Sequence, residues 1–289
     1  MRHLYRCPIR WADLDMLGHV NNVIYVDYLQ EARIDMLRTH APEIRATDVG
    51  EGLVVVRHEV QFVAPLMFRA EPVSIECWVT EIRAGSFTMA YEVFDETATG
   101  RRVYLRATTV LAPFVFAEER PRRLRPDEKD VLRGFVEPSP LPPSVRMGEP
   151  KLLEAGHYPL HVRFSDVDAY GHVNNVKYFE YFQEARIAYI THVAHDGSDI
   201  GVQFVVAQCD VDYKTPILFR GEPYRVQSWV SHVGRSSFGM ESIILDGDTV
   251  LSRARVVMVT FDRATQRSVP APERVRALFQ EQFEAAARA

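Results

Sequence analysis

The chain of 289 residues has few cysteines, no long apolar run and no basic stripe. Its three cysteines (Cys7, Cys77 and Cys209) are an odd number without metal-binding spacing, so we interpret them as reduced thiols in a cytoplasmic protein. No uninterrupted run of about 18 apolar residues exists, which argues against a membrane-spanning helix. The opening MRHLYRCPIRWADLD has no apolar segment followed by a cleavage site, so we expect no signal peptide.

The charge pattern argues against a nucleic-acid partner. The net charge is -5, and basic residues are mixed with acidic ones instead of forming a stripe. The nearest thing to a basic cluster is Arg120, Arg122, Arg123 and Arg125. We interpret it as a solvated segment after a strand, and contact with an anionic group such as a nucleotide 3′-phosphate is the alternative.

The chain contains two copies of one unit. RWADLDMLGHVNNVIYVDYLQEARI, from Arg10 to Ile34, returns as RFSDVDAYGHVNNVKYFEYFQEARI, from Arg163 to Ile187. FVAPLMFRAEP likewise returns as YKTPILFRGEP, and GSFTM as SSFGM. Two copies of this length indicate a duplicated domain and not a solenoid. We therefore predict an N-terminal domain over 1–136, a Pro-rich linker over 137–150 and a C-terminal domain with a terminal helix over 151–289.

Each copy has one helical pattern followed by strand patterns. Apolar residues after HVNN recur at helical spacing, as at Val23, Val26 and Leu29. Four alternating segments follow in each copy: VVVRHEVQF, VSIECWVTEI, SFTMAYEVF and VYLRATTVLAPFVF in the first, and FVVAQCDVDY, YRVQSWVSHV, FGMESIIL and VLSRARVVMVTF in the second. This pattern predicts an α+β fold in which an antiparallel sheet covers one long helix. PERVRALFQEQFEAAA predicts a closing helix.

The doubled string D-x-D-x-x-G-H-V-N-N, followed by a long helix and strands, resembles the hotdog-fold thioesterases. It is most similar to the 4-hydroxybenzoyl-CoA thioesterase group and to the acyl-ACP thioesterases, and the resemblance covers both copies. It implies two hotdog domains, each a curved antiparallel sheet wrapped around a long helix, which form a pseudo-dimer within the chain. Active sites at the seam between the halves and further homo-oligomerisation are expected from the same resemblance.

The resemblance assigns candidate catalytic residues. Asp15 and Asp168 match the family's catalytic carboxylate, which acts as a nucleophile or as a base for water. The backbone N–H of Asn22 or Asn175 is the expected oxyanion donor, because a helix N-terminus presents unpaired N–H groups. His19 and His172, which match a histidine of the acyl-ACP enzymes, either polarise the carbonyl, assist proton transfer or are structural.

The remaining motif residues have structural alternatives. Asp13 and Asp166 are interpreted as turn or cap groups, Asn21 and Asn174 as caps, and the repeated Glu-Ala-Arg (residues 31–33 and 184–186) as a salt-bridged helix flank. Substrate contact is a candidate role for Tyr25, Tyr178, Ser86, Phe87, Arg235, Ser237 and Phe238, with core or strand-start positions as the alternative. No metal site and no cofactor are expected, because coenzyme A would be part of the substrate.

These residues predict an acyl-CoA thioesterase. Leu17 and Tyr170 stand where acyl-ACP thioesterases keep an asparagine, which favours CoA over carrier-protein substrates. An acyl-ACP thioesterase and a non-catalytic acyl-thioester binding protein remain the alternatives. The expected partners are therefore the thioester substrate and further copies of the chain, without nucleic acid or membrane.

Overall fold

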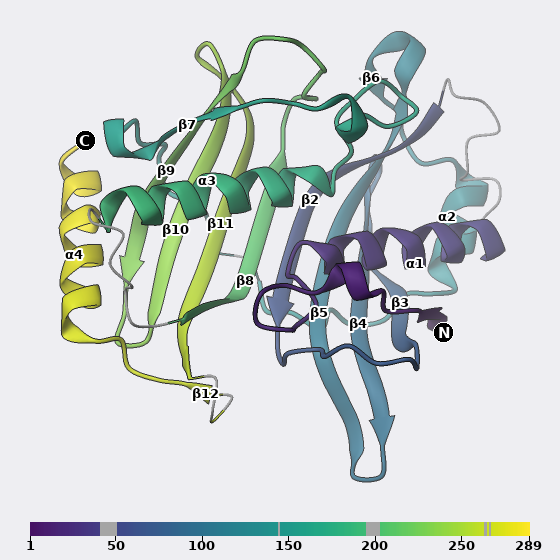
Figure 1. Cartoon of the computed structure of the whole chain (residues 1–289). Helices are drawn as coiled ribbons and strands as arrows, with labels where there is room; N and C mark the ends of the chain where they lie inside the picture. The colour runs from purple at the N-terminus through teal and green to yellow at the C-terminus, as the bar shows by residue number, and fades with distance from the viewer. Residues whose placement is uncertain (41–50, 144, 195–202, 263–264, 266) are drawn as a thin grey trace. The chain divides into compact units, whose positions relative to one another are not determined.

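The computed structural model describes residues 1–40, 51–143, 145–194, 203–262, 265 and 267–289. The chain divides into two compact units, Met1–Ser144 and Val145–Ala289 (Figure 1). The Pro-rich tract predicted as a linker spans this division. No helix within the described ranges has the length and apolar character needed to cross a membrane.

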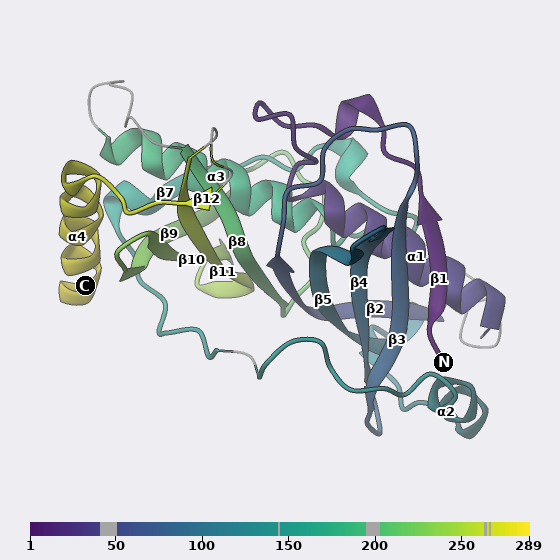
Figure 2. The same ribbon diagram turned by 90° about the horizontal axis from the view of Figure 1, so that it is seen from below.

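Unit 1 is an antiparallel sheet packed on one long helix. Its strands follow the spatial order β1 (His3–Cys7), β3 (Val73–Ile82), β4 (Phe87–Thr97), β5 (Gly100–Val115) and β2 (Glu51–Phe62). The helix α1 (Ile24–His40) packs on β1 and β3 (Figure 2). Its buried stripe includes Val26, Leu29, Ala32 and Met36, which are the residues that the helical spacing indicated.

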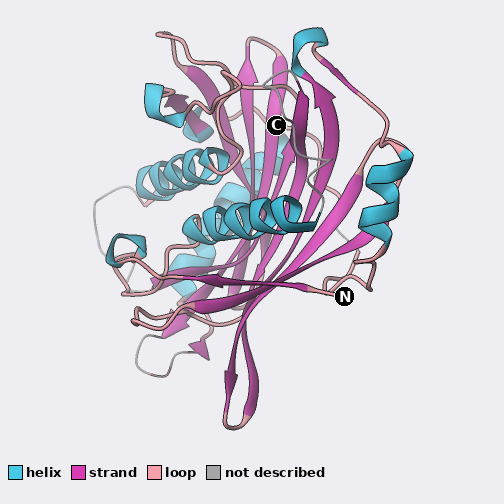
Figure 3. Ribbon diagram, turned by 90° about the vertical axis from the view of Figure 1, so that its right-hand side faces the viewer, coloured by secondary structure: helices cyan, strands magenta, loops and turns pink. Residues whose placement is uncertain are grey.

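Unit 2 repeats this arrangement. Its strands follow the order β8 (Gln203–Tyr213), β11 (Thr249–Asp262), β10 (Ser237–Asp246), β9 (Tyr224–Val233) and β7 (His157–Leu160), and its long helix is α3 (Lys177–Val193). The closing helix α4 (Glu273–Arg288) packs on β9 and buries Val275, Phe279 and Ala286. The predicted fold, two hotdog domains in one chain, is confirmed (Figure 3).

Several short elements were missed by the sequence analysis. They are β1 and β7, which pair with β3 and β9, the two-residue strands β6 (Arg120–Pro121) and β12 (Arg267–Ser268), and the helix α2 (Pro126–Arg133). In α2, Pro126 occupies the first turn and Glu128 accepts the Arg125 N–H at 2.7 Å. Proline at the start and glutamate at the third position are a recognisable helix-start signal.

The basic cluster differs from its predicted solvated state. Arg122 bonds the fully buried Glu128 with two nitrogens, at 2.7 and 3.0 Å, and also pairs with Glu51 at 3.1 Å. Arg125 pairs with Glu128 at 3.0 Å. The interpretation as a solvated segment was therefore wrong for Arg122, which is half-buried and ties α2 to the first residue of β2, whereas Arg125 is exposed as expected although it is ion-paired.

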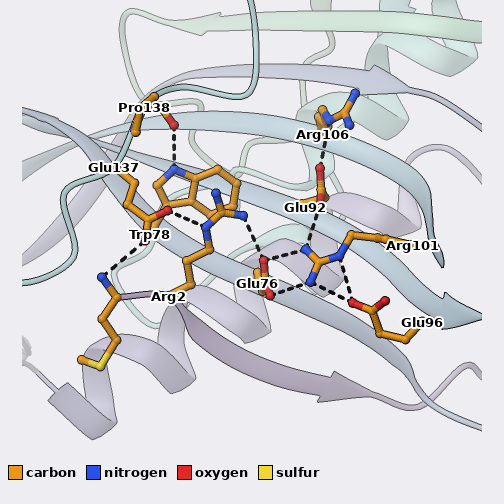
Figure 4. A network of polar contacts seen from close by, with 10 residues as sticks. Arg2, Glu76, Trp78, Glu92, Glu96, Arg101, Arg106, Glu137 and Pro138 are labelled. Atoms are coloured by element: carbon orange, nitrogen blue, oxygen red, sulfur yellow. Dashed lines mark hydrogen bonds and ion pairs between the residues drawn. The ribbon is translucent and has the colours of Figure 1, made fainter.

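A polar network fastens the start of the Pro-rich tract to unit 1 (Figure 4). Trp78 Nε1 donates to the Pro138 carbonyl at 2.9 Å, and the Arg2 guanidinium lies 3.9 Å above the Trp78 ring while bonding Glu137 at 2.8 Å. In unit 2, Gly148 N–H donates to the Glu241 carboxylate at 3.0 Å. Both ends of the tract are thus bound to the unit that they adjoin.

Candidate active site

A tight turn carries the first candidate carboxylate. The Gly18 N–H donates to the Asp15 carbonyl at 3.0 Å, and Gly18 has φ +78°, which a side chain would strain. Asp15 Oδ1 accepts the N–H groups of Leu17 at 2.8 Å and His19 at 3.1 Å. Its second oxygen, Oδ2, has no hydrogen-bond donor within the described part of the chain. The turn therefore fixes this half-buried carboxylate through one of its two oxygens.

Unit 2 builds the same turn around Asp168. Gly171 has φ +80° and donates to the Asp168 carbonyl at 3.1 Å. Asp168 Oδ1 accepts the Tyr170 N–H at 2.9 Å. The Asp168 N–H donates to the His172 carbonyl at 2.8 Å, and in unit 1 the Asp15 N–H donates to the His19 carbonyl at the same distance. The duplicated sequence thus produces a duplicated geometry.

Asp13 and Asp166 are buried anchors, as their interpretation as turn groups predicted. Asp13 is only 2% exposed and accepts the Arg10 N–H at 2.8 Å and the Tyr28 hydroxyl. Asp166 accepts the Arg163 N–H at 2.9 Å and the Tyr181 hydroxyl at 2.7 Å. Burial opposes ionisation of Asp13, but the hydrogen bonds from Arg10 and Tyr28 outweigh it and hold the pKa of Asp13 below its ordinary value.

The asparagine pair precedes each long helix. Asn21 Oδ1 accepts the Val23 N–H at 3.2 Å, and Asn174 Oδ1 accepts the Val176 N–H at 3.1 Å, in the turn that leads into each helix. The N-cap of α3 is Val176, so Asn174 lies two residues before the cap position that was predicted for it. The Asn22 N–H has no acceptor among the described residues. It precedes the first residue of α1, Ile24, at the positive end of the helix dipole.

The two histidines follow the carboxylate turns. Each forms an isolated backbone bridge to the segment before β3 or β9, His19 with Met67 and His172 with Leu218. His19 is buried and His172 is half-buried. These bridges therefore join each carboxylate turn to the segment before β3 or β9.

Tyr25 and Tyr178 are buried in the cores. The Ile217 N–H donates to the Tyr178 hydroxyl at 3.1 Å, and the Leu66 backbone makes the corresponding bond to Tyr25. Burial raises the pKa of both hydroxyls. With each only 3% exposed, the geometry favours the core alternative over substrate contact.

The Ser-Phe pairs stand at strand starts. Phe87 is the first residue of β4, and Phe238 is the second residue of β10. Both side chains are fully buried. The Phe238 ring packs 4.3 Å from that of Phe279, which favours a core position. Ser86 and Ser237 are half-buried and Arg235 is exposed, so these three polar groups keep access to solvent.

The Glu-Ala-Arg repeat does not form the salt-bridged flank that was expected. Arg33 and Arg186 are 6% and 7% exposed and point into the cores. The Arg33 guanidinium bonds the Tyr91 hydroxyl, while its Nη1 has no partner within the described residues. The sequence interpretation was wrong because each arginine lies in the middle of its helix, within the stripe of buried residues, and not on the exposed flank.

The cysteines are all buried thiols. Burial raises the pKa of Cys7 and of Cys209 to about 12, so their thiolates are negligible near neutral pH. In the described ranges, no three His, Cys, Asp or Glu side chains are grouped to hold a metal ion.

The chain has two hotdog units, each with a carboxylate turn before its long helix, and this arrangement is typical of thioesterase-like proteins. Over residues 9–147 and 162–279 the chain matches the family model described as the thioesterase-like superfamily. The chain belongs to that superfamily.

Individual relatives support the fold assignment. An uncharacterized protein of Bacillus subtilis, YsmA, is 34% identical over 110 residues, which are 37% of this chain and 74% of that protein. An acyl-ACP thioesterase structure from Bacteroides thetaiotaomicron superposes with a TM-score of 0.67 at 15% identity, covering 89% of this chain and 97% of the other. The 12:0-ACP thioesterase of Umbellularia californica gives a TM-score of 0.71 at 18% identity, covering 90% and 94%. At these identities the two structures share the fold.

Proposed function

We propose that this chain hydrolyses acyl thioesters to a free acid and a thiol at two sites, one in each unit. The observation that supports this most directly is the duplicated carboxylate turn. In the first unit, Asp15 is held by backbone N–H groups through Oδ1, while Oδ2 has no donor in the described part of the chain. A structural aspartate such as Asp13 uses both oxygens, so the two carboxylates of the D-x-D differ in what they leave available.

The proposed reaction divides the work between the carboxylate and the helix start. Asp15 Oδ2 takes a proton from water as the water oxygen attacks the thioester carbon, or it attacks that carbon itself and water then cleaves the anhydride. The C–S bond breaks, and the thiolate leaves and takes up a proton. The Asn22 N–H stabilises the oxygen that becomes negative. His19 assists by polarising the carbonyl or moving the proton. Asp168, Asn175 and His172 take the same roles in unit 2.

CoA thioesters are the favoured substrates. Leu17 and Tyr170 depart from the asparagine kept by acyl-ACP thioesterases, although two neighbours in fold carry that activity in their names. An acyl-carrier thioester is therefore the second candidate, and a non-catalytic acyl-thioester binder is the third.

The test is release of free thiol from a panel of acyl-CoAs and from the same acyl groups on a carrier protein. We expect wild type to hydrolyse the CoA thioesters and the double variant Asp15→Asn, Asp168→Asn to be nearly inactive. Asp13→Asn is not a suitable control, because it removes a buried anchor; Phe283→Ala, an exposed position on α4, is the matched control. Hydrolysis confined to carrier substrates supports the second candidate, and tight binding without turnover supports the third.

A further inference from the structure

The helix starts of the two units share several backbone bonds and differ at one side chain. In unit 2 the Tyr213 hydroxyl donates to the backbone carbonyl of Asn175 at 2.8 Å. In the aligned repeat Tyr213 corresponds to Phe62, which has no hydroxyl to donate. Because Asn175 is the proposed oxyanion residue of unit 2, this bond reaches the backbone on which the proposed chemistry depends.

Both units fix the residue before the proposed oxyanion donor. The Asn174 N–H donates to the Asp166 carbonyl at 2.8 Å, and the Asn174 carbonyl accepts the Lys177 N–H at 3.0 Å. In unit 1, Asn21 makes the two corresponding backbone bonds, also at 2.8 and 3.0 Å. The peptide plane that carries the proposed oxyanion N–H is therefore bonded at its carbonyl end in both units.

The next peptide plane is bonded at both ends in unit 2. It contains the Asn175 carbonyl and the Val176 N–H, which move together because the peptide is planar. The Asn174 side chain accepts the Val176 N–H at 3.1 Å, and Tyr213 donates to the carbonyl at the opposite end. In unit 1 the corresponding Val23 N–H is bonded at 3.2 Å, but the residue at position 62 has no hydroxyl to hold the carbonyl.

The ring of Tyr213 is itself held in place. It packs edge-to-face against the ring of Tyr178, with centroids 4.8 Å apart at 64°, and Tyr178 is buried. Tyr213 is the last residue of β8 and pairs with Ser252 of β11, whose hydroxyl donates to the Asp212 carbonyl at 2.7 Å. The hydroxyl that reaches Asn175 is therefore positioned by the sheet and the core before any substrate binds.

Phe62 holds the equivalent place in unit 1. It is the last residue of β2, and its ring packs against that of Tyr25, with centroids 5.7 Å apart at 72°. The aromatic contact is thus present in both units, whereas the hydroxyl belongs to unit 2. Packing explains why an aromatic ring stands here, but it does not explain the hydroxyl, because phenylalanine makes the same contact in unit 1.

We propose that Tyr213 is a positioning residue for the second site, because its bond to the Asn175 carbonyl keeps the Asn175 N–H aimed at the oxygen that becomes negative. This inference rests on the proposed function and deepens it, since it makes the two sites unequal. An oxyanion donor is effective when its direction is fixed before the charge develops. The bond is only partly buried, so water replaces some of it when it is lost. We therefore expect a several-fold effect and not the roughly hundredfold loss that follows removal of a donor.

Kinetics test the second site alone in the Asp15→Asn background. Tyr213→Phe keeps the ring and removes the hydroxyl. With a thioester that the wild type hydrolyses, kcat is expected to fall roughly threefold to tenfold at unchanged KM, because the lost interaction acts on the transition state. Tyr189→Phe is the matched control, since it removes a hydroxyl from the distant half of α3, where that hydroxyl bonds Gln282 at 3.3 Å. An unchanged kcat in Tyr213→Phe, or an equal fall in the control, would overturn the proposal.

Inhibitor binding separates positioning from a general loss of structure. A trifluoromethyl ketone analogue of the substrate forms a tetrahedral centre whose oxygen resembles that of the transition state, whereas a thioether analogue has no such oxygen. In Tyr213→Phe, the Kd of the ketone should rise by about the factor by which kcat/KM falls, and the Kd of the thioether should stay the same. Equal weakening of both ligands would rule out a positioning role.

The reciprocal change tests the difference between the units. In the Asp168→Asn background, Phe62→Tyr supplies a hydroxyl near Asn22, and kcat of the first site is expected to rise several-fold. A variant no faster than its parent would contradict the assignment of this difference to the hydroxyl. If the wild type hydrolyses no thioester, the proposed function and this inference fail together. If the wild type is active and Tyr213→Phe has no effect, the inference fails alone.

Discussion

Tyr28→Phe removes one hydroxyl from a buried carboxylate and leaves the ring in place. The Tyr28 hydroxyl donates to Asp13, which is 2% exposed, so water cannot easily replace the lost donor. The Arg10 N–H, at 2.8 Å, and the Arg10 guanidinium, at 2.9 Å, remain. The carboxylate therefore stays ionised but loses one of its strong donors.

A hydrogen bond to a charged group contributes about 1.5–3 kcal/mol, and we expect a loss near 2 kcal/mol because two donors remain. For a unit of this size, each kcal/mol shifts Tm by roughly 2–4 °C. Unit 1 should therefore melt about 4–8 °C lower. Tyr181→Phe removes the equivalent bond to Asp166, 2.7 Å long, and should lower the transition of unit 2 by a similar amount.

Scanning calorimetry on the full chain measures both effects, and near-ultraviolet circular dichroism checks that the aromatic cores remain packed. A Tyr28→Phe protein whose transitions all stay within about a degree of wild type would refute the anchoring role of Asp13. A fall in both units after a single substitution would show that the anchor is not local to its unit.

Three further predictions concern unit 1. Hydrogen bonds hold the folded pKa of Asp13 and Glu76 below the unfolded values, in Glu76 chiefly the bond from Arg101. These groups therefore stabilise the fold above about pH 4 and lose that contribution as pH falls further; denaturant midpoints from pH 7 to 3 should decline at the acid end, and a flat profile would contradict this. Arg33→Met removes a buried guanidinium with an unpartnered nitrogen, so the unfolding free energy should stay the same or rise by about 1–4 kcal/mol; a large loss would disprove it. Gly18→Ala strains a residue at φ +78° and shifts Asp15, so kcat of the first site should fall at least about tenfold, with an unchanged kcat counting against the turn.

The long elements could be predicted from the sequence because each has its own period. The strands β3 and β9 are ten residues long and begin with an apolar–polar alternation (VSIE and YRVQ), and α1 and α3 keep a helical stripe over four turns. The strands β1 and β7 span five and four residues, too few to show alternation, and exist because they pair with β3 and β9. Their positions depend on tertiary structure.

The sequence pattern could not predict which charged and polar side chains are buried. The sequence shows His58 replaced by Cys209 between the copies, but only the register shows why the change is tolerated. His58 bonds Thr109 at 2.9 Å across the sheet, and Cys209 faces Val256, so a polar pair in one unit becomes an apolar pair in the other.

For the candidate site, the local sequence was informative. The repeated motif identified Asp15 as a candidate, and the structure shows which of its oxygens is held by backbone N–H groups. The sequence did not show that Trp11 and Phe164 are exposed, because RWADLD and RFSDVD look like any strand-to-helix connection. Their outward position follows from the anchoring of the neighbouring aspartates.

Two-site hydrolysis is tested most directly by thiol release from one acyl-CoA with four proteins: wild type, Asp15→Asn, Asp168→Asn and the double variant, each checked for folding by circular dichroism. Asparagine keeps the shape of the side chain and removes the base and nucleophile. Each single variant should therefore lose the part of the thiol-release rate that one site contributes. The double variant should be at least about a hundredfold slower than wild type. A folded double variant that retains the wild-type rate would contradict the assignment of these two carboxylates.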